Sequence, residues 1–191
     1  ITSTELALRK PHSAAALQEL LGIQLEELRR VSAMVQDMLF LAQVDRGAQA
    51  RRSPVPSLRA LAQSVANYHE AAFAEAELAL AIVGDASGNF DPPLLKRALS
   101  NLLSNACRYA LPGSLVEIRI APLEPNQVRL SVSNLSSSEA EIKPQDLPRI
   151  FDRLYRSDTA RSQPGSHHGL GLSIVAAVAR MHVGQPLAHR A

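Results

Sequence analysis

Apolar residues recur at a step of about 3.5 residues along the stretch from Leu17 to Val44, which is a helical period. A second apolar stripe adjoins the first and passes through Val31, Met34, Met38 and Leu41. Two adjoining stripes predict a helix with two partners, as in a helical bundle. Upstream, Thr2–Lys10 is compatible with a preceding helix and Pro11–Ser13 with a turn, so residues 1–46 predict a helical hairpin. A lone hairpin of two helices is too thin to be stable, so we expect it either to dimerise into a four-helix bundle or to pack against the rest of the chain.

A polar, proline-containing stretch at residues 47–57 predicts a linker. Beyond it, residues 58–191 predict a second domain in which helices and strands are mixed. The expected helices are residues 58–74, 92–109, 146–156 and 170–182, the first two capped by Ser57 and Asp91. The expected strands are residues 77–83, 115–120 and 128–134, with another beginning at Gln185. This order predicts an α+β fold in which helices cover one face of a mixed sheet.

The helix predicted around residues 94–109 has a distinctive polar face. Asn101, Asn105 and Arg108 lie within roughly 60° of one another, because their spacing is i, i+4 and i+7. The opposite arc is apolar and consists of Leu95, Leu99, Leu102, Leu103 and Ala106. Two carboxamides and a guanidinium can hold a hydrated Mg²⁺ ion and the phosphates that it neutralises. The alternative is an ordinary solvated helix face.

A second candidate site is the sequence Gly169-Leu170-Gly171-Leu172, which joins a polar loop at residues 157–168 to an apolar helix. Glycines allow a ligand to approach the backbone closely, and the first turn of a helix offers unpaired N–H groups to phosphate. The spacing matches neither a P-loop nor a dinucleotide fingerprint. The polar loop could fold over a nucleotide as a lid. Its histidines, His167 and His168, could instead bind a metal, but no third ligand is apparent nearby.

Composition narrows the classes of function. With 191 residues, 46% hydrophobic and 20% charged, the chain can bury an ordinary core. The net charge of +2 is spread over both signs and there is no Trp, so nucleic acid is not an expected partner. The single cysteine, Cys107, cannot form an internal disulfide, which fits a reducing compartment. No run of 18 apolar residues and no signal pattern is present, so any membrane anchor is expected outside these residues.

Three ordered motifs resemble the asparagine, phenylalanine and second glycine boxes of bacterial sensor histidine kinases. They are NLLSNACRY at Asn101–Tyr109, FDRLYRSDTAR at Phe151–Arg161 and GLGL at Gly169–Leu172. In addition, MVQDMLFLAQVD at Met34–Asp45 is similar to the second helix of that family's dimerisation and phosphotransfer domain. Together with FDRLYRSDTAR, it points to the heavy-metal sensor subgroup. The resemblance implies a dimerising helical hairpin followed by a Bergerat-type (GHKL) α/β sandwich that binds ATP and Mg²⁺.

The resemblance also implies roles for individual residues. Asn105 is expected to be the principal Mg²⁺ ligand, with Asn101 beside it. Arg108 is expected to meet phosphate and Tyr109 to line the nucleotide pocket. The remaining expected contacts are the lid hinge Phe151, the lid cations Arg156 and Arg161, and the phosphate-admitting turn Gly169, Leu170, Gly171 and Leu172.

The adenine-binding stretch departs from the family pattern. Many members have an aspartate followed by spaced glycines, whereas this chain has Asn134 followed by Leu-Ser-Ser-Ser. The Asn134 carboxamide oxygen could accept the hydrogen bond from the adenine amino group. The missing glycines predict a reshaped adenine pocket and weaker nucleotide binding.

The family moves the γ-phosphoryl group of ATP to a histidine of the bundle and then to an aspartate of a response regulator. The resemblance therefore implies a homodimer, a receiver-domain partner and a place in the cytoplasmic part of a bacterial inner-membrane protein. The phosphoacceptor motif H-E-x-R-T-P is expected immediately before Ile1, and none of the six histidines lies in such a motif. We therefore expect a fragment that binds nucleotide without phosphorylating itself. The alternatives are another ATPase of the same superfamily, such as a gyrase-like, chaperone-like or anti-sigma-factor kinase, and a degenerate dimerisation module that no longer binds ATP.

Overall fold

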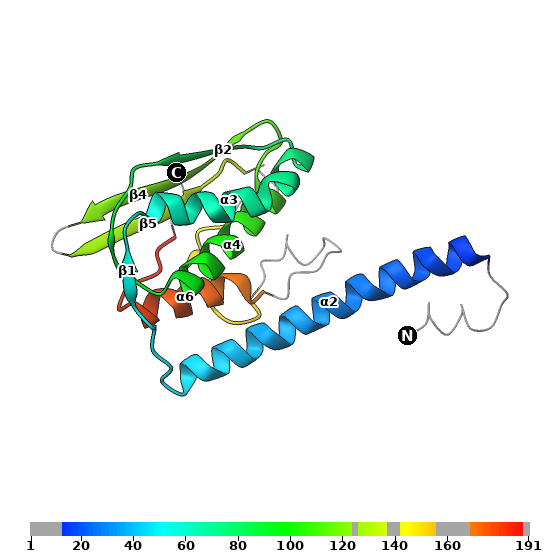
Figure 1. The fold of residues 1–191 in the computed structure, drawn as a ribbon, viewed down its shortest axis with the longest axis horizontal. Coiled ribbons are helices and arrows are strands. Elements are labelled where there is room, and N and C mark those ends of the chain that lie inside the picture. Colours follow the sequence, from blue (N-terminus) through cyan, green and yellow to red (C-terminus); the bar gives the residue numbers. More distant parts are fainter. Residues whose placement is uncertain (1–12, 124–125, 137–141, 156–168, 189–191) are drawn as a thin grey trace. The chain divides into compact units, whose positions relative to one another are not determined.

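The structure is a computed structural model that describes residues 13–123, 126–136, 142–155 and 169–188. The chain divides into two compact units, Ile1–Phe40 and Leu41–Ala191. Helix α2 (Ala14–Asp45) supplies the described part of the first unit and the opening residues of the second (Figure 1). In the described part of the chain, no helix is long and apolar enough to cross a membrane.

Helix α2 confirms the helix predicted over residues 17–44 and begins three residues earlier. The Ser13 hydroxyl accepts a hydrogen bond from the Ala16 N–H at 3.2 Å, which satisfies one of the unpaired donors of the first turn. Nine of its large apolar side chains are exposed, with 44% to 67% of their surface accessible; they are Leu17, Leu21, Ile23, Leu25, Leu28, Val31, Val35, Met38 and Leu39. Phe40 and Leu41, near the end of the helix, are buried. The helix and turn predicted upstream lie almost entirely in residues 1–12, outside the described residues.

The second unit contains the predicted mixed sheet. Its strands are β2 (Ala79–Val83), β4 (Leu115–Leu123) and β5 (Gln127–Ser133), in the order β2-β4-β5. β2 runs parallel to β4, and β4 runs antiparallel to β5, so that Ile118 lies opposite both Ile82 and Val132. The predicted pairing of residues 115–120 with residues 128–134 is confirmed.

A second, two-stranded sheet was not predicted. β1 (Ser53–Val55) pairs antiparallel with β3 (Gly88–Phe90), and β1 lies within the stretch predicted to be a linker. Strands of three residues are too short to produce a readable alternation of apolar and polar positions. Pro54, which is tolerated only where a strand needs no hydrogen-bond donor, also argues against a strand at this place.

Three helices lie on one face of the mixed sheet, as predicted (Figure 1). They are α3 (Leu58–Glu75), α4 (Pro92–Tyr109) and α6 (Gly171–Met181). α4 packs between α3 and α6. The predicted caps are confirmed, because the Ser57 hydroxyl accepts from the Ala60 N–H at 3.0 Å and the Asp91 Oδ1 accepts from the Leu94 N–H at 3.2 Å.

The core between the helices and the sheet is built from the predicted apolar arc of α4 and the inward positions of β4. Leu99, Leu103, Val116, Ile118 and Ile120 are almost completely buried. Cys107 is half-buried against this core as a free thiol, and burial raises the pKa of that thiol. Burial of this apolar surface is the main force that holds α4 against the sheet.

One polar contact crosses between α3 and α4. His69 on α3 is buried, and its Nε2 lies 2.8 Å from the Ser100 hydroxyl oxygen on α4. Removal from water lowers the pKa of His69, because a buried imidazole is costly to charge.

Two predicted elements differ in the structure. Instead of a helix over residues 146–156, only Leu147–Arg149 form a short 3-10 helix, η1, because Leu154 adopts a left-handed φ of 61° that a helix cannot accommodate. Instead of a strand from Gln185, residues 185–188 are irregular, since Pro186 removes a backbone donor that a strand would need.

Candidate functional site

The polar face of α4 carries the two predicted magnesium ligands. Asn101 and Asn105 are both half-buried. The Asn101 side-chain nitrogen donates to the Arg97 carbonyl at 2.9 Å, which leaves its Oδ1 facing the start of α6. The Asn105 side chain makes no hydrogen bond to any residue that the structure describes. Neither carboxamide oxygen accepts a hydrogen bond from a described residue, and oxygen is the atom that Mg²⁺ prefers.

The start of α6 comes close to this face because it lacks a side chain. A Cβ atom on Gly171 would lie 3.0 Å from the Asn101 Oδ1. Leu170, the residue before the helix, provides no side-chain cap for α6, unlike the caps of α3 and α4. Among the described residues, no side chain accepts from the first N–H groups of α6, and the positive end of a helix favours an anion. The Leu170 side chain is buried, so any phosphate contact there would come from the backbone.

Gly169 shapes the turn before α6. Its φ of 70° is left-handed, and a Cβ atom would lie 2.8 Å from the Tyr155 carbonyl oxygen and 2.9 Å from the Leu154 carbonyl carbon. The Leu154 N–H donates to the Gly169 carbonyl at 3.1 Å. The segment after η1 and the predicted phosphate turn are therefore held together, which the sequence order of the two motifs did not reveal.

The predicted lid residues are described only in part. Phe151 is half-buried just after η1. Nearby, the Tyr155 hydroxyl donates to the Asp146 Oδ1 at 2.6 Å, and the Arg149 guanidinium lies 4.6 Å from the centre of the Tyr155 ring. These contacts hold the segment, although no role was predicted for Tyr155. Arg156, Arg161, His167 and His168 lie outside the described residues.

The two predicted residues at the end of α4 lie side by side. The Arg108 guanidinium carbon is 5.5 Å from the centre of the Tyr109 ring, within the range of a cation–π contact. Both side chains are half-buried. A cation at this place favours negatively charged ligands near the α4 polar face.

Asn134 is brought to the same end of α4. It follows β5 and is exposed, and its side-chain nitrogen donates to the Leu135 carbonyl at 3.3 Å. The same carbonyl accepts from the Leu111 N–H at 2.8 Å, and Ser136 forms a β-bridge with Ala110. The structure thus places the predicted adenine acceptor beside the segment that follows Tyr109.

An ion pair that the sequence did not indicate joins two distant segments of the second unit. The Arg153 guanidinium donates to the Asp45 carboxylate at 2.5 Å, across 108 positions of sequence. This hydrogen bond lowers the pKa of Asp45 and raises that of Arg153. No local signal marks such a pair, because both side chains are exposed and ordinary in their own segments.

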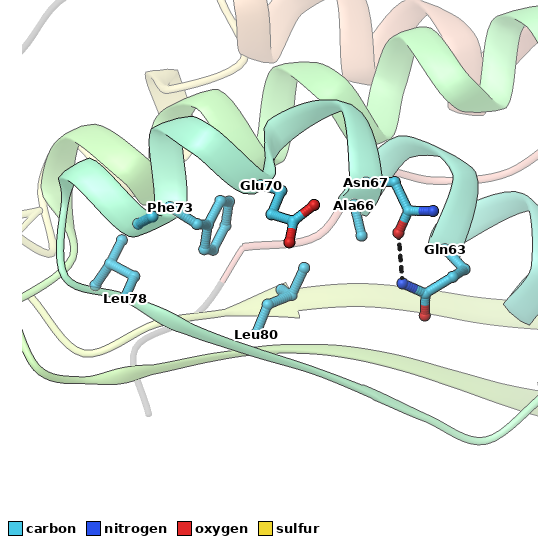
Figure 2. Close-up of a pocket in the computed structure, with 8 residues that line it drawn as sticks. Gln63, Ala66, Asn67, Glu70, Phe73, Leu78 and Leu80 are labelled. Atoms are coloured by element: carbon cyan, nitrogen blue, oxygen red, sulfur yellow. Dashed lines mark hydrogen bonds between the residues drawn. The ribbon is translucent and has the colours of Figure 1, made fainter.

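The candidate site residues belong neither to a metal-binding cluster of the described residues nor to the pocket described below. Among the described residues, no group of three or more His, Cys, Asp or Glu side chains could hold a metal ion. A pocket of about 330 Å³ lies between α3 and β2 (Figure 2). Its lining consists of Gln63, Ala66, Asn67, Glu70, Phe73, Ala74, Leu78 and Leu80, none of which was predicted to bind nucleotide.

Comparisons with known proteins identify the family of the chain. Residues 90–189 match the family described as histidine kinase-, DNA gyrase B- and HSP90-like ATPases. The sensor histidine kinase CusS of Escherichia coli O157:H7 is 40% identical over 187 residues, which cover 96% of this chain and 38% of that relative. The chain thus spans about two fifths of the length of the curated relatives that it matches first.

Solved structures show the same fold. The histidine kinase AdeS of Acinetobacter baumannii superposes with a TM-score of 0.67 at 20% identity, over 90% of this chain and 76% of that chain. A mycobacterial sensor histidine kinase, MprB, gives 0.57 at 29% identity, over 69% of this chain and 82% of that chain. The predicted α+β architecture and the resemblance to the heavy-metal subgroup of sensor histidine kinases are confirmed. The chain belongs to the histidine kinase-, DNA gyrase B- and HSP90-like ATPase family, and the curated relatives that it resembles are sensor histidine kinases.

Proposed function

We propose that this chain is the ATP-binding catalytic part of a two-component sensor histidine kinase, lying on the cytoplasmic side of a bacterial inner membrane. One observation carries the proposal: the Asn101 oxygen on α4 faces the start of α6, where no described side chain caps the helix. Oxygen ligands for a cation and N–H donors for an anion therefore meet in one place. Mg²⁺ with a nucleotide phosphate is a ligand that needs both.

Each residue of the site has a role in this proposal. Asn105 and Asn101 hold the magnesium ion, and Arg108 and the first N–H groups of α6 bind the phosphates. The Asn134 oxygen accepts from the adenine amino group. Mg²⁺ would neutralise charge on the phosphates. The protein contributes positioning and fixed positive charge, which are most of what phosphoryl transfer requires.

The reaction proposed for the whole protein has two steps. The γ-phosphoryl group passes from ATP to a ring nitrogen of a histidine on the dimerisation helices, which leaves ADP. It then passes to an aspartate carboxylate of a response regulator, which leaves the free histidine. None of the six histidines of this sequence lies in an H-E-x-R-T-P motif, so the acceptor is proposed to lie outside these residues.

Calorimetry with ATP and Mg²⁺ tests the nucleotide site. The unaltered chain should bind, and Asn105→Ala should weaken binding at least about tenfold, because each 1.4 kcal/mol lost is a factor of ten. Asn67→Ala is the matched control, since it makes the same change on an exposed face of α3. The absence of binding by the unaltered chain would reject the proposal in favour of a dimerisation module without ATP. Equal losses in both variants would reject the assignment of Asn105.

We further propose that α2 contributes to a homodimer, most simply through a four-helix bundle. The support is the run of exposed apolar side chains along α2, since surface of this kind marks an interaction face. Val35→Glu should give monomers in analytical ultracentrifugation, because a charge would be buried in the interface. Ser32→Glu, at another exposed position of α2, serves as the control. An unchanged sedimentation mass for Val35→Glu would contradict the interface.

A further inference from the structure

Helices α4 and α6 are joined by a side-chain hydrogen bond at the end away from Gly171. The Asp91 N–H, at the N-terminal cap of α4, donates to the His182 Nε2 at 2.9 Å. The His182 Nδ1, at the C-terminal cap of α6, lies 2.9 Å from the Val178 carbonyl oxygen. An N–H can only donate and a carbonyl can only accept. The network therefore assigns His182 as a neutral imidazole with its hydrogen on Nδ1.

The linker is attached to the same two residues and their neighbours. The Asp91 Oδ2 accepts from the Arg51 N–H at 2.7 Å, while its Oδ1 caps α4. The Arg52 guanidinium donates to the Met181 carbonyl at 3.4 Å. Asp91 is only 8% exposed, so a lost partner would leave a buried polar group unsatisfied. We call this cluster, formed by Asp91, His182 and the Arg51 backbone, the Asp91–His182 junction.

The junction and the proposed nucleotide site lie at two ends of the same helix pair. Asn101 on α4 and Gly171 on α6 are each about 15 Å from the junction along their helices, at 1.5 Å per residue. There the helices approach again, because Gly171 leaves room for the Asn101 oxygen. Packed helices move as stiff bodies, so a bond that fixes one end restricts the spacing at the other.

We propose that His182 is a positioning residue: its hydrogen bond to Asp91 fixes α4 against α6, and so sets the spacing between Asn101 and the start of α6. The Arg51 N–H donates to the side chain of the same Asp91, so the linker is bonded to the residue that holds α4 against α6. The consequence for nucleotide affinity rests on the proposed function, whereas the consequence for the helix pair does not.

Two substitutions separate the two hydrogen bonds of His182. Asparagine keeps a donor at the Nδ1 position, toward Val178, but does not reach Asp91. Glutamine places its oxygen near the Nε2 position, where it can accept from the Asp91 N–H. His69→Asn is the matched control, because it removes a buried histidine contact between α3 and α4 instead of α4 and α6.

Nuclear magnetic resonance of the ¹⁵N-labelled chain without nucleotide tests the junction directly. Long-range ¹H–¹⁵N spectra at neutral pH should show His182 with its hydrogen on Nδ1 and a bare Nε2. His182→Asn should shift the amide signals of Gly171 and Arg51 and the side-chain amide of Asn101, and His182→Gln should restore them. A hydrogen on Nε2 in the unaltered chain would overturn the proposal. Shifts confined to the residues next to His182 would do the same.

Nucleotide titrations then test the effect on the site. His182→Asn should bind ATP with Mg²⁺ about fivefold more weakly, the factor that corresponds to the loss of one ordinary hydrogen bond, and His182→Gln should recover most of the affinity. His69→Asn should lower the thermal midpoint while keeping the affinity. An equal loss of affinity in His69→Asn would mean general destabilisation and would overturn the proposal. If the unaltered chain does not bind ATP, the proposed function fails, while the resonance measurements still decide the junction.

Discussion

At one end of the α4–α6 pair, Asp91 and His182 bond to each other and to the linker, whereas at the other end Asn101 and Gly171 face each other with α6 uncapped. The first end has its polar groups satisfied and fixes the two helices. The second leaves carboxamide oxygens and helix N–H groups for water or a ligand. Buried polar groups without partners are costly. The Asp91–His182 junction, which fixes the two helices, thus lies about 15 Å from the polar groups that are proposed to bind the ligand.

The largest effect on stability is expected at the closed end. Asp91→Ala removes the cap of α4 and the acceptor of the Arg51 N–H, so the free energy of unfolding should fall by about 2 to 4 kcal/mol. Urea unfolding measures it. Ser57→Ala, which removes the cap of α3 and an exposed hydrogen bond to Asp85, should cost only about 1 kcal/mol. Equal costs would contradict the larger contribution expected from the buried Asp91.

A smaller effect is expected at the open end. Gly169→Ala forces a side chain into a left-handed backbone and against the Tyr155 and Leu154 backbone, so stability should fall by about 2 kcal/mol and nucleotide affinity should also fall. Gly113→Ala is the control, because Gly113 has a φ of 78° but open space around it. It should cost about 1 kcal/mol and leave nucleotide affinity unchanged. Chemical denaturation and ATP titration of both variants measure the difference.

The stability of the fold is expected to depend on pH through the contact between α3 and α4, which is not part of the α4–α6 pair. Burial lowers the pKa of His69 below its usual 6.5, so the unfolded chain binds a proton more readily than the folded one. Stability should therefore be complete above pH 6.5 and should decrease as pH falls below it. Unfolding experiments between pH 7.5 and roughly pH 5 should show this slope, with a smaller slope in His69→Asn. The same slope in both chains would assign the dependence to other groups.

The smallest effect is expected for the Asp45–Arg153 ion pair. Both side chains are exposed, and exposed pairs contribute little in water. Asp45→Asn should leave the urea midpoint unchanged within error, at low and at high salt. A clear, salt-sensitive loss of stability would show that this pair, like the Asp91–His182 junction, fixes part of the second unit.

The local features of the fold were predictable from the sequence. Ser57 and Asp91 mark the starts of α3 and α4, and the apolar arc through Leu99 and Leu103 predicts the buried side of α4. These signals lie within a few residues of what they determine. The three motifs were recognisable for the same reason, and the structure places Asn101 beside Gly171.

Long-range polar contacts were not predictable. Asp91 and His182 are 91 residues apart, and Asp45 and Arg153 are 108 apart. A hydrogen bond between distant segments depends on packing that no local periodicity records. The same limit explains the helix predicted over residues 146–156, since the left-handed Leu154 reflects its bond to the Gly169 carbonyl and not its own preference.

The single thiol of the chain has a practical consequence. Cys107 sits on α4 two residues after Asn105, yet it packs against the core and its pKa is raised by burial. A thiolate is the reactive form, so alkylating reagents should modify Cys107 slowly while α4 is packed against the sheet and faster when α4 transiently separates from it. A change in the labelling rate of this one sulfur therefore reports a change in how firmly α4, the helix proposed to bear the nucleotide ligands, is held against the core.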